Sequence, residues 1–270
     1  MNKQLFLLLI LSVSVLFNTY AIRIEQDSAH FDQLGYDNCD MIKNGELDVV
    51  RELIQPDAIV FDVGANQGEW SKHVLNMQPS ITVYAFEPAP VTCTKLRLNF
   101  ANLKNVHIFN IALSKEVGKK TFFWYNTNQQ ATECCGLYHR PIIDQIIGTQ
   151  PTHLLVDTDT LTLFCQRHTI TTIDFLKIDT EGSEFDILLG AYEFLANKQA
   201  RVIQFEYGGT YPDSHTTLKE VYTLLTSLNY TLYRIVPWGL IEITQWRTEL
   251  ETFKYANYIA AAQPLSMLSN

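Results

Sequence analysis

Residues 60–68, Val-Phe-Asp-Val-Gly-Ala-Asn-Gln-Gly, join a short apolar run to a glycine-rich turn. The run starts at Ala58 and holds one acid, Asp62, as expected of a strand that is buried on both faces of a parallel sheet. Gly64 suits a tight turn, and Gly68 lets the following helix pack close to the strand. Because ligands bind outside the carboxyl ends of parallel strands, this stretch predicts a ligand site on a Rossmann-like sheet.

Strand and helix patterns alternate along the rest of the chain. Apolar runs predict seven buried strands, at residues 58–63, 81–86, 106–113, 175–179, 202–207, 230–236 and 255–261. Helical spacing of apolar residues predicts helices at 40–55, 69–77, 90–102, 160–168, 184–197 and 217–229. This alternation predicts an α/β fold with a mostly parallel seven-stranded sheet and helices on both faces. The domain is expected at residues 56–265, after a helical lead-in at 22–55.

The middle of the chain interrupts this alternation. Residues 121–125 are strand-like, whereas residues 126–150 have mixed polarity and match no motif. We expect an insertion or a substrate-covering lobe here, and we expect the choice of acceptor to depend on it.

The first residues differ from the rest of the chain. A short basic start is followed by an apolar run from Leu5 to Phe17, and Thr19 to Ala21 are small residues apart from Tyr20. Residues 1–21 are therefore predicted to be a secretory signal peptide or, if uncleaved, an N-terminal anchor. The protein is then exported, or membrane-anchored and facing the cytoplasm, with membrane contact only through the leader. A buried N-terminal helix is the alternative.

Composition limits the partners. The formal net charge of -9 argues against a broad nucleic-acid surface, which needs Lys and Arg to neutralise phosphates. The five cysteines and the histidines show no metal-ligand spacing, so no metal is predicted. Most cysteines are expected to be reduced core thiols, although adjacent Cys134 and Cys135 leave disulfides open for an exported protein. The oligomeric state stays open.

Several positions distinguish the cofactor classes. Asn66 stands where a dinucleotide site has a glycine, and Glu69 at the helix start would repel a pyrophosphate. Glu87 closes the second strand about twenty residues later, where an acid accepts hydrogen bonds from ribose hydroxyls. The ammonium group of a methionine-like tail prefers acids, and Asp62 and Asp179 both lie at strand ends near the turn. The sequence favours S-adenosylmethionine over NAD; a tight turn without a ligand is the alternative.

Three blocks carry a resemblance to a known family. They are residues 60–68, Phe86-Glu87-Pro88, and residues 175–184 (Phe-Leu-Lys-Ile-Asp-Thr-Glu-Gly-Ser-Glu). In this order they closely resemble the FkbM-like methyltransferase family, over about residues 58–233. The third block is the most specific, because Asp-x-Glu-Gly after a buried strand is uncommon in other Rossmann-like methyltransferases. The resemblance implies a class I methyltransferase fold and S-adenosylmethionine-dependent O-methylation, often of sugars or polyketide hydroxyls.

The resemblance also implies which residues form the site. Cofactor contacts are expected from Asp62, Gly64, Asn66, Gly68, Glu87, Asn110, Ala112 and Asp179. The turn that holds Asn110 and Ala112 would lie along the adenine, and Asp179 and Glu181 would face the methyl-transfer centre. A hydroxyl acceptor must also lose its proton, for which Asp179, Glu181 and Glu206 are the candidate catalytic residues. His215 is a weaker candidate, with a surface position as its alternative. Glu181 has a second interpretation, as a residue that shapes the turn and caps the next helix.

Two rival functions are weighed against a methyltransferase acting on a small-molecule or glycan hydroxyl. The first is an exported, non-catalytic binding or scaffold protein that retains the fold, which would account for the leader and the cysteines. The second is an NAD-dependent oxidoreductase. Asn66 and the missing third glycine argue against it, because a dinucleotide-binding turn has glycines at these positions. The intact set of cofactor residues favours the enzyme.

Overall fold

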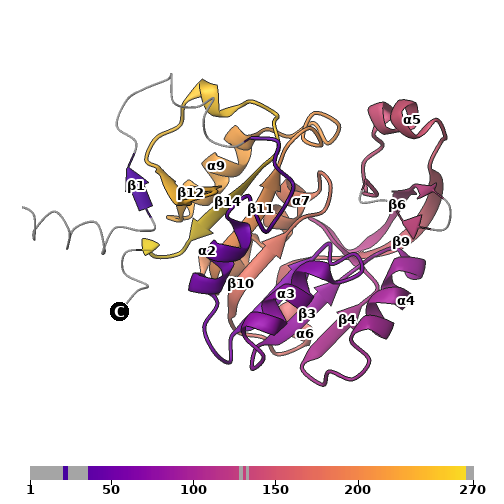
Figure 1. Cartoon of the computed structure of the whole chain (residues 1–270), viewed down its shortest axis with the longest axis horizontal. Helices are drawn as coiled ribbons and strands as arrows, with labels where there is room; N and C mark the ends of the chain where they lie inside the picture. The colour runs from indigo at the N-terminus through magenta and orange to yellow at the C-terminus, as the bar shows by residue number, and fades with distance from the viewer. Residues whose placement is uncertain (1–20, 24–35, 128–129, 132–133, 266–270) are drawn as a thin grey trace, which may run out of the picture.

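The computed structural model describes residues 21–23, 36–127, 130–131 and 134–265. Apart from Ala21, the predicted leader lies outside the described residues. The seven predicted strands all lie in one central sheet, which has nine strands among the described residues (Figure 1). In spatial order these are β1 (Ala21–Arg23), β13 (Gly239–Ile243), β12 (Thr231–Val236), β14 (Ala256–Ala261), β11 (Ala200–Tyr207), β10 (Ile173–Ile178), β2 (Ile59–Val63), β3 (Thr82–Phe86) and β4 (Val106–Phe109).

The direction of the strands identifies the fold class. The five strands from β4 to β11 run parallel, and β14 runs antiparallel to both of its neighbours, β11 and β12. The motif strand β2 lies inside the sheet, between β10 and β3. This is the Rossmann-like class I methyltransferase arrangement, as predicted. Strands β13 and β1 extend the sheet beyond the predicted seven.

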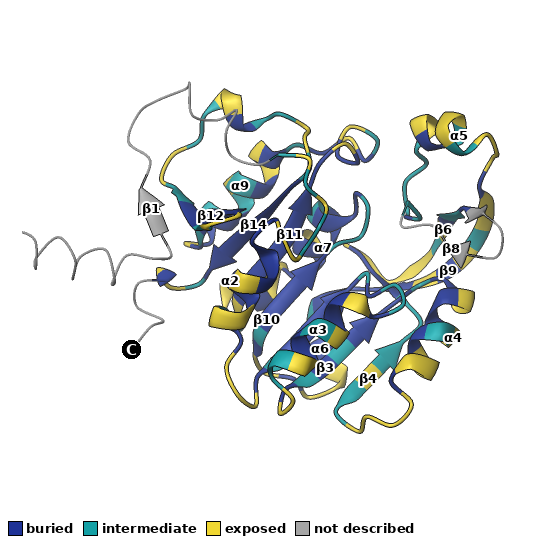
Figure 2. Ribbon diagram, viewed as in Figure 1, coloured by how far each residue is buried: buried dark blue, intermediate teal, exposed yellow. Residues whose placement is uncertain are grey.

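Helices cover both faces, and alternate residues of each strand point to opposite faces. On one face Val60, Phe175 and Val202 pack with α2 (Glu46–Leu53), α3 (Glu69–Met77) and α4 (Pro90–Asn99). On the other, Phe61, Leu176 and Ile203 pack with helices α6 (Leu161–Arg167), α7 (Glu184–Gly190), α8 (Tyr192–Ala196) and α9 (Leu218–Ser227). Both sides of the central strands are therefore buried, while the outer sides of the helices are exposed (Figure 2).

Two predicted helices differ from the structure. The lead-in helix begins at Glu46 rather than near residue 40. Gly45, directly before it, has a φ of 92°, which is outside the helical range, so the helix does not extend further toward the N-terminus. The helix predicted at 184–197 is divided into α7 and α8 around Gly190 and Ala191. A Cβ at Gly190 would lie 2.1 Å from the carbonyl oxygen of Ser114, so a glycine is needed here to let the Ser114 backbone pack against the helix.

The middle of the chain forms a lobe beside the sheet. The strand predicted at 106–113 leaves the main sheet after Phe109, and its last part, β5 (Ala112–Leu113), belongs to a second sheet with β9 (Thr152–Asp159) and β6 (Gly118–Trp124). Helix α5 (Pro141–Ile147) lies at the far end of this lobe (Figure 1). Strand β9 and helix α5 were not predicted. The short strands β7 (Asn126–Thr127) and β8 (Gln130–Ala131) form a separate pair.

One buried acid ties the lobe to the main sheet. Asp186 of α7 pairs with Lys115 at 3.1 Å and with Lys120 at 3.2 Å, and Tyr138 donates a hydrogen bond to it at 3.0 Å. These three partners all belong to the lobe, so its base is anchored beside the carboxyl ends of the strands.

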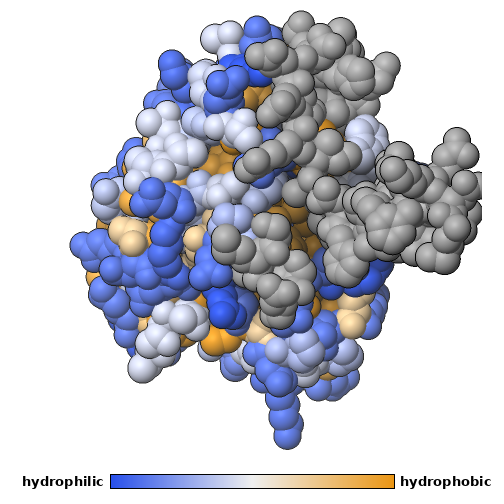
Figure 3. Space-filling view, turned by 90° about the vertical axis from the view of Figure 1, so that its left-hand side faces the viewer, coloured by the Kyte–Doolittle hydropathy of each residue, from blue (hydrophilic) through white to orange (hydrophobic). Residues whose placement is uncertain are grey.

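The described surface on the face shown in Figure 3 is mostly hydrophilic, with small hydrophobic areas between polar side chains. Within the described ranges, no helix has the length and apolarity that crossing a membrane requires.

Candidate active site

A large cleft opens at the carboxyl ends of β2, β3, β10 and β11, with a volume of about 1270 Å³. Its lining includes the motif turn, the lead-in and α2, the segments after β3, β10 and β11, the end of α4, the lobe, and the segment before β14. This position is the one predicted from the parallel strands, because their carboxyl ends leave loops free to form a binding surface.

The glycines of the motif turn are required by close contacts. Gly64 has a φ of 85°, and a Cβ there would lie 1.8 Å from the carbonyl oxygen of Asp179. Gly68 has a φ of 88°, and a Cβ there would lie 2.2 Å from the Phe100 ring. Any larger residue would therefore push β2 away from β10, or α3 away from α4. Both glycines line the cleft.

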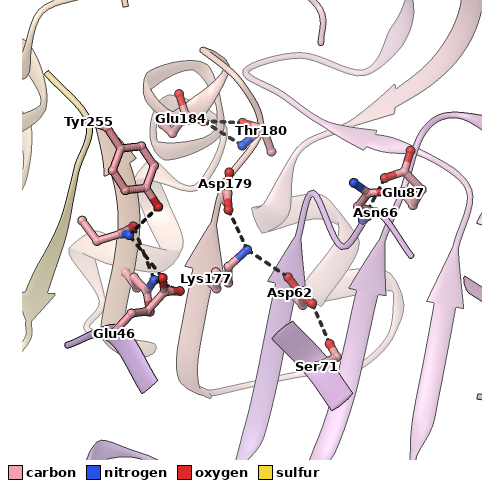
Figure 4. Close-up of polar contacts among 12 residues, drawn as sticks. Glu46, Asp62, Asn66, Ser71, Glu87, Lys177, Asp179, Thr180, Glu184 and Tyr255 are labelled. Atoms are coloured by element: carbon pink, nitrogen blue, oxygen red, sulfur yellow. Dashed lines mark hydrogen bonds and ion pairs between the residues drawn. The ribbon is translucent and has the colours of Figure 1, made fainter. Parts of the chain in front are cut away.

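Glu87 holds the turn in place as well as lining the cleft. Its Oε2 accepts a hydrogen bond from the Asn66 backbone amide at 3.0 Å, and its Oε1 accepts one from Ala89 at 2.8 Å (Figure 4). Burial raises the pKa of Glu87 to about 7. Its oxygens keep further lone pairs, so the predicted contact with ribose hydroxyls stays compatible with these two bonds.

Asn66 presents an unused acceptor to the cleft. Its Oδ1 is buried, and among the described residues it has no hydrogen-bond partner. An orphaned buried acceptor is costly, so a ligand that donates a hydrogen bond fits this position. Ala112 and Leu113 add an apolar wall, as predicted for the adenine. Asn110 does not line the cleft; its side-chain amide donates to the carbonyl oxygens of Glu87 and Pro88.

Asp62 lies behind the turn, which is at odds with a direct cofactor contact. Its side chain is fully buried and does not line the cleft. Ser71 of α3 donates a hydrogen bond to its Oδ2 at 2.6 Å, and the Lys177 ammonium lies 3.6 Å from its Oδ1. The carboxylate therefore joins β2 to α3 and β10, and supports the turn from below (Figure 4).

Lys177 is a central residue that sequence reasoning missed. It lies opposite Asp62 and Gln204 in the strand register, and its Nζ also contacts Asp179 at 3.0 Å. Burial lowers the pKa of Lys177, but the negative charges of Asp179, Asp62 and Glu46 outweigh that effect and raise it. A lysine within an apolar strand would have been a usable signal, because it needs buried acids beside it.

Asp179 and Glu206 come together at adjacent strand ends. Ile178 of β10 pairs with Phe205 of β11, so the next residues along, Asp179 and Glu206, lie side by side. Their carboxyl groups are hydrogen-bonded to each other, and both line the cleft. Burial and the charge of Asp179 raise the pKa of Glu206 well above its ordinary value. Burial also acts on Asp179, but Lys177 holds its pKa below the ordinary value.

Glu181 bonds to the lobe and also lies close enough to Glu206 for its charge to raise the pKa of Glu206. It lines the cleft, and Arg140 of the lobe donates a hydrogen bond to its Oε2 at 2.5 Å. The alternative role predicted for Glu181, shaping the turn before α7, belongs to Glu184. The Oε1 of Glu184 accepts hydrogen bonds from Thr180 N and Oγ1 and from Gly182 N, at 2.8, 2.9 and 3.3 Å.

The lead-in and the end of the chain supply a wall that the sequence did not indicate. Glu46 of α2 is buried and lines the cleft; the side-chain amides of Gln204 and Asn257 donate to its two oxygens at 2.7 and 3.3 Å. Asn257 also donates to the Tyr255 hydroxyl at 3.0 Å. Burial raises the pKa of Glu46. This wall is polar and adjoins Glu206, because Asn257 is the β14 partner of Glu206 in the strand register.

The remaining sequence candidates are peripheral. His215, a weaker candidate base, is exposed and does not line the cleft. All five cysteines lie in described parts of the chain, and of these five only Cys93 and Cys165 are buried. The expectation that most are core residues is therefore wrong. Within the described ranges, no group of three His, Cys, Asp or Glu side chains is arranged to hold a metal ion.

Comparison with known proteins agrees with this geometry. The family model described as the methyltransferase FkbM domain matches residues 62–232, which is more than half of the chain. The chain belongs to the FkbM methyltransferase family. The resemblance in the three sequence blocks is thereby confirmed, and so is the prediction of a methyltransferase that uses S-adenosylmethionine.

Individual relatives are distant. The chain is 27% identical over 164 residues to the 2-O-methyltransferase NoeI of Sinorhizobium fredii, covering 59% of this chain and 67% of NoeI. It is 29% identical over 157 residues to the 31-O-demethyl-FK506 methyltransferase FkbM of Streptomyces tacrolimicus, covering 51% of this chain and 60% of that relative. Among solved structures, precorrin-6y C5,15-methyltransferase from Geobacter metallireducens has 12% identity and a TM-score of 0.45, covering 86% of this chain and 96% of that one.

Proposed function

We propose that this chain transfers the methyl group of S-adenosylmethionine to a hydroxyl group of a sugar, a glycan or another small polyhydroxylated acceptor. The observation that carries the proposal is the pair of Asp179 and Glu206 at the floor of a cleft that also holds the motif turn. The names of NoeI and of the FK506 enzyme both describe methylation at an oxygen, which supports a hydroxyl acceptor here.

The size and lining of the cleft support two ligands. Its volume of about 1270 Å³ exceeds the roughly 300–1,000 Å³ of a pocket for one small molecule. The motif turn, Glu87 and Ala112 would hold the methyl donor. The opposite wall, with Glu46 and Tyr255, offers hydrogen-bonding groups that suit a polyhydroxylated acceptor.

The chemistry needs alignment and one proton acceptor. Bound S-adenosylmethionine supplies an electrophilic methyl group, and the cleft walls orient the acceptor toward it. Glu206 is the proposed base: its raised pKa makes the carboxylate a stronger proton acceptor than an ordinary Glu. Asp179 is the weaker candidate, because Lys177 stabilises its ionised form.

Methyl transfer to a panel of neutral sugars and oligosaccharides tests the proposal, with methyl-labelled donor and mass spectrometry of both products. We expect a methylated sugar to form together with S-adenosylhomocysteine. E206Q should lower kcat about 100-fold, whereas E193Q, a change of an exposed residue on α8, should leave it unchanged. Folded protein that binds the donor but methylates no hydroxyl would contradict the proposal and favour the non-catalytic alternative.

A further inference from the structure

We infer that Glu206 carries the proton of the Asp179–Glu206 pair in the cofactor-free protein, and gives it up when the cationic methyl donor enters the cleft. Lys177 acts as the positioning residue that decides which of the two acids holds this proton. The base would then be activated by the donor itself. The inference rests on the proposed role of Glu206 as the base.

The first step is the geometry of the pair. Asp179 and Glu206 lie side by side at the ends of two hydrogen-bonded parallel strands, and their carboxyl groups contact each other. The Glu206 side chain is about nine-tenths buried, at 8% exposure. The Asp179 side chain is 38% exposed, so the deep burial is that of Glu206. Two carboxyl groups in contact, one of them deeply buried, repel each other when both are ionised, so the pair holds one proton at neutral pH.

The second step is the position of that proton. The Lys177 ammonium lies 3.0 Å from an oxygen of Asp179, and its other carboxylate neighbour is Asp62 at 3.6 Å. The cation therefore stabilises the ionised form of Asp179, and the proton stays on Glu206, which donates a hydrogen bond to Asp179. The opposite directions of the two pKa values agree with this assignment.

The third step is the electrostatic surroundings of Glu206. Facing it are mostly acidic or phenolic groups from the neighbouring elements, and two cations flank this cluster: Lys177 beside Asp179, and Arg140 of the lobe beside Glu181. The acidic and phenolic groups are Asp179 after β10, Glu181 and Glu184 before and in α7, Tyr211 in the loop after β11, Tyr255 before β14, and Glu46 on α2, which is bonded to the β14 partner of Glu206. Such an acidic setting keeps Glu206 protonated until a positive charge arrives.

The fourth step is the charge of the donor. S-adenosylmethionine has a sulfonium, an ammonium and a carboxylate group, and so brings a net positive charge into the cleft. Opposite charge in a site of low dielectric favours the ionised carboxyl, so Glu206 releases its proton to solvent. The free Glu206 carboxylate then accepts the proton of the acceptor hydroxyl. S-adenosylhomocysteine lacks the sulfonium charge and serves as the matched neutral ligand.

Isothermal titration calorimetry at pH 6.5, in buffers of different ionisation enthalpy, measures the protons released on binding. We expect S-adenosylmethionine to release about one proton per site, and S-adenosylhomocysteine to release far less. Both ligands share the same α-amino group, so its own titration cancels in the comparison. E206Q should still bind S-adenosylmethionine but release no proton, and E193Q should behave as the parent protein.

The role of Lys177 is tested by measuring the protons released on S-adenosylmethionine binding at several pH values. K177M should shift the midpoint of the profile to higher pH, because the pair loses its compensating cation, and K177R should restore it. Equal release by the two ligands, release that persists in E206Q, or an unshifted profile in K177M would overturn the inference. No acceptor is present in these titrations, so a failure of hydroxyl methylation and a failure of proton release are separate results.

Discussion

Asp62 and Glu87 show how neighbouring strand ends use acids differently. The Asp62 side chain points to the α3 face, where its oxygens contact Ser71 and Lys177. Glu87 instead lines the cleft and holds the motif turn. Asp62 lies within β2 and Glu87 follows β3, and both were predicted from the sequence to contact the cofactor. The difference depends on which side of the sheet each side chain faces and on what lies there.

Asn66 provides the sharpest test of the cofactor site at the scale of one residue. We expect N66G to weaken S-adenosylmethionine binding about 10-fold, since a hydrogen bond in a buried site contributes about 1.4 kcal/mol. Glycine is chosen because Asn66 has a φ of 48°, where alanine would add strain. Calorimetry gives the affinity, and N197A, at an exposed position after α8, is the control. An unchanged affinity would mean that Oδ1 has no partner on the donor.

The lobe is the element that distinguishes this chain most clearly from a bare sheet with helices. Its base is held by Asp186, and its outer part is held over the cleft by Arg140 at the start of α5. Arg140 reaches Glu181 at 2.5 Å and lies 3.9 Å from Asp213, so two loops of the main sheet share one lobe side chain. These contacts place the predicted insertion at the cleft.

Removing this link should loosen the lobe without unfolding the protein. We expect R140A to speed hydrogen exchange of the α5 amides about 10-fold, because local opening then breaks one fewer charged hydrogen bond. Hydrogen–deuterium exchange with mass spectrometry measures it. K119A is the matched control, since the Lys119–Asp157 pair lies within the lobe and joins it to nothing else. Equal protection of α5 in R140A and in the parent protein would show that Asp186 alone holds the lobe.

At the scale of the whole molecule, buried acids set how stability depends on pH. Burial raises the pKa of both Glu87 and Glu184 to about 7, from an ordinary value of 4.5. Between pH 4.5 and 7, the carboxyl groups of Glu87 and Glu184 are ionised in the unfolded chain but still protonated in the folded protein. The free energy of unfolding therefore falls as pH rises from about 4.5 to 7.

We expect E184Q to flatten this pH dependence. Glutamine preserves the acceptor oxygen that binds Thr180 and Gly182, and removes the titration. The parent protein should lose about 3 kcal/mol per buried acid between pH 4.5 and 8, and E184Q should lose correspondingly less. Urea unfolding at several pH values measures the difference, with E193Q as the control. A slope in E184Q equal to that of the parent protein would assign the effect to other acids.

The leader predicted at residues 1–21 stays a prediction, and so does export or anchoring of the protein. Cell fractionation with sequencing of the mature N-terminus would check both.

Local sequence determined the strands, the motif turn and the family. Strands and tight turns depend on residues that are close in the sequence. The apolar runs and the glycine positions therefore sufficed to predict the seven strands, the bounds of α3 and the cofactor class. Of the predicted site residues, those that line the one cleft are Gly64, Asn66, Gly68, Glu87, Ala112, Asp179, Glu181 and Glu206, and their contacts with cofactor and acceptor stay predictions.

Only the tertiary structure decided the ionic state of the site and its outer walls. The Lys177 contacts, the pairing of Asp179 with Glu206 and the approach of Glu46 all join residues far apart in the chain. Strand register sets these distances. Burial and the charge of Lys177 then shift the pKa values of Asp179 and Glu206 in opposite directions. The motif at residues 60–68 identifies the methyl donor, whereas the pairing of β10 with β11 brings together the two acids from which we propose the base.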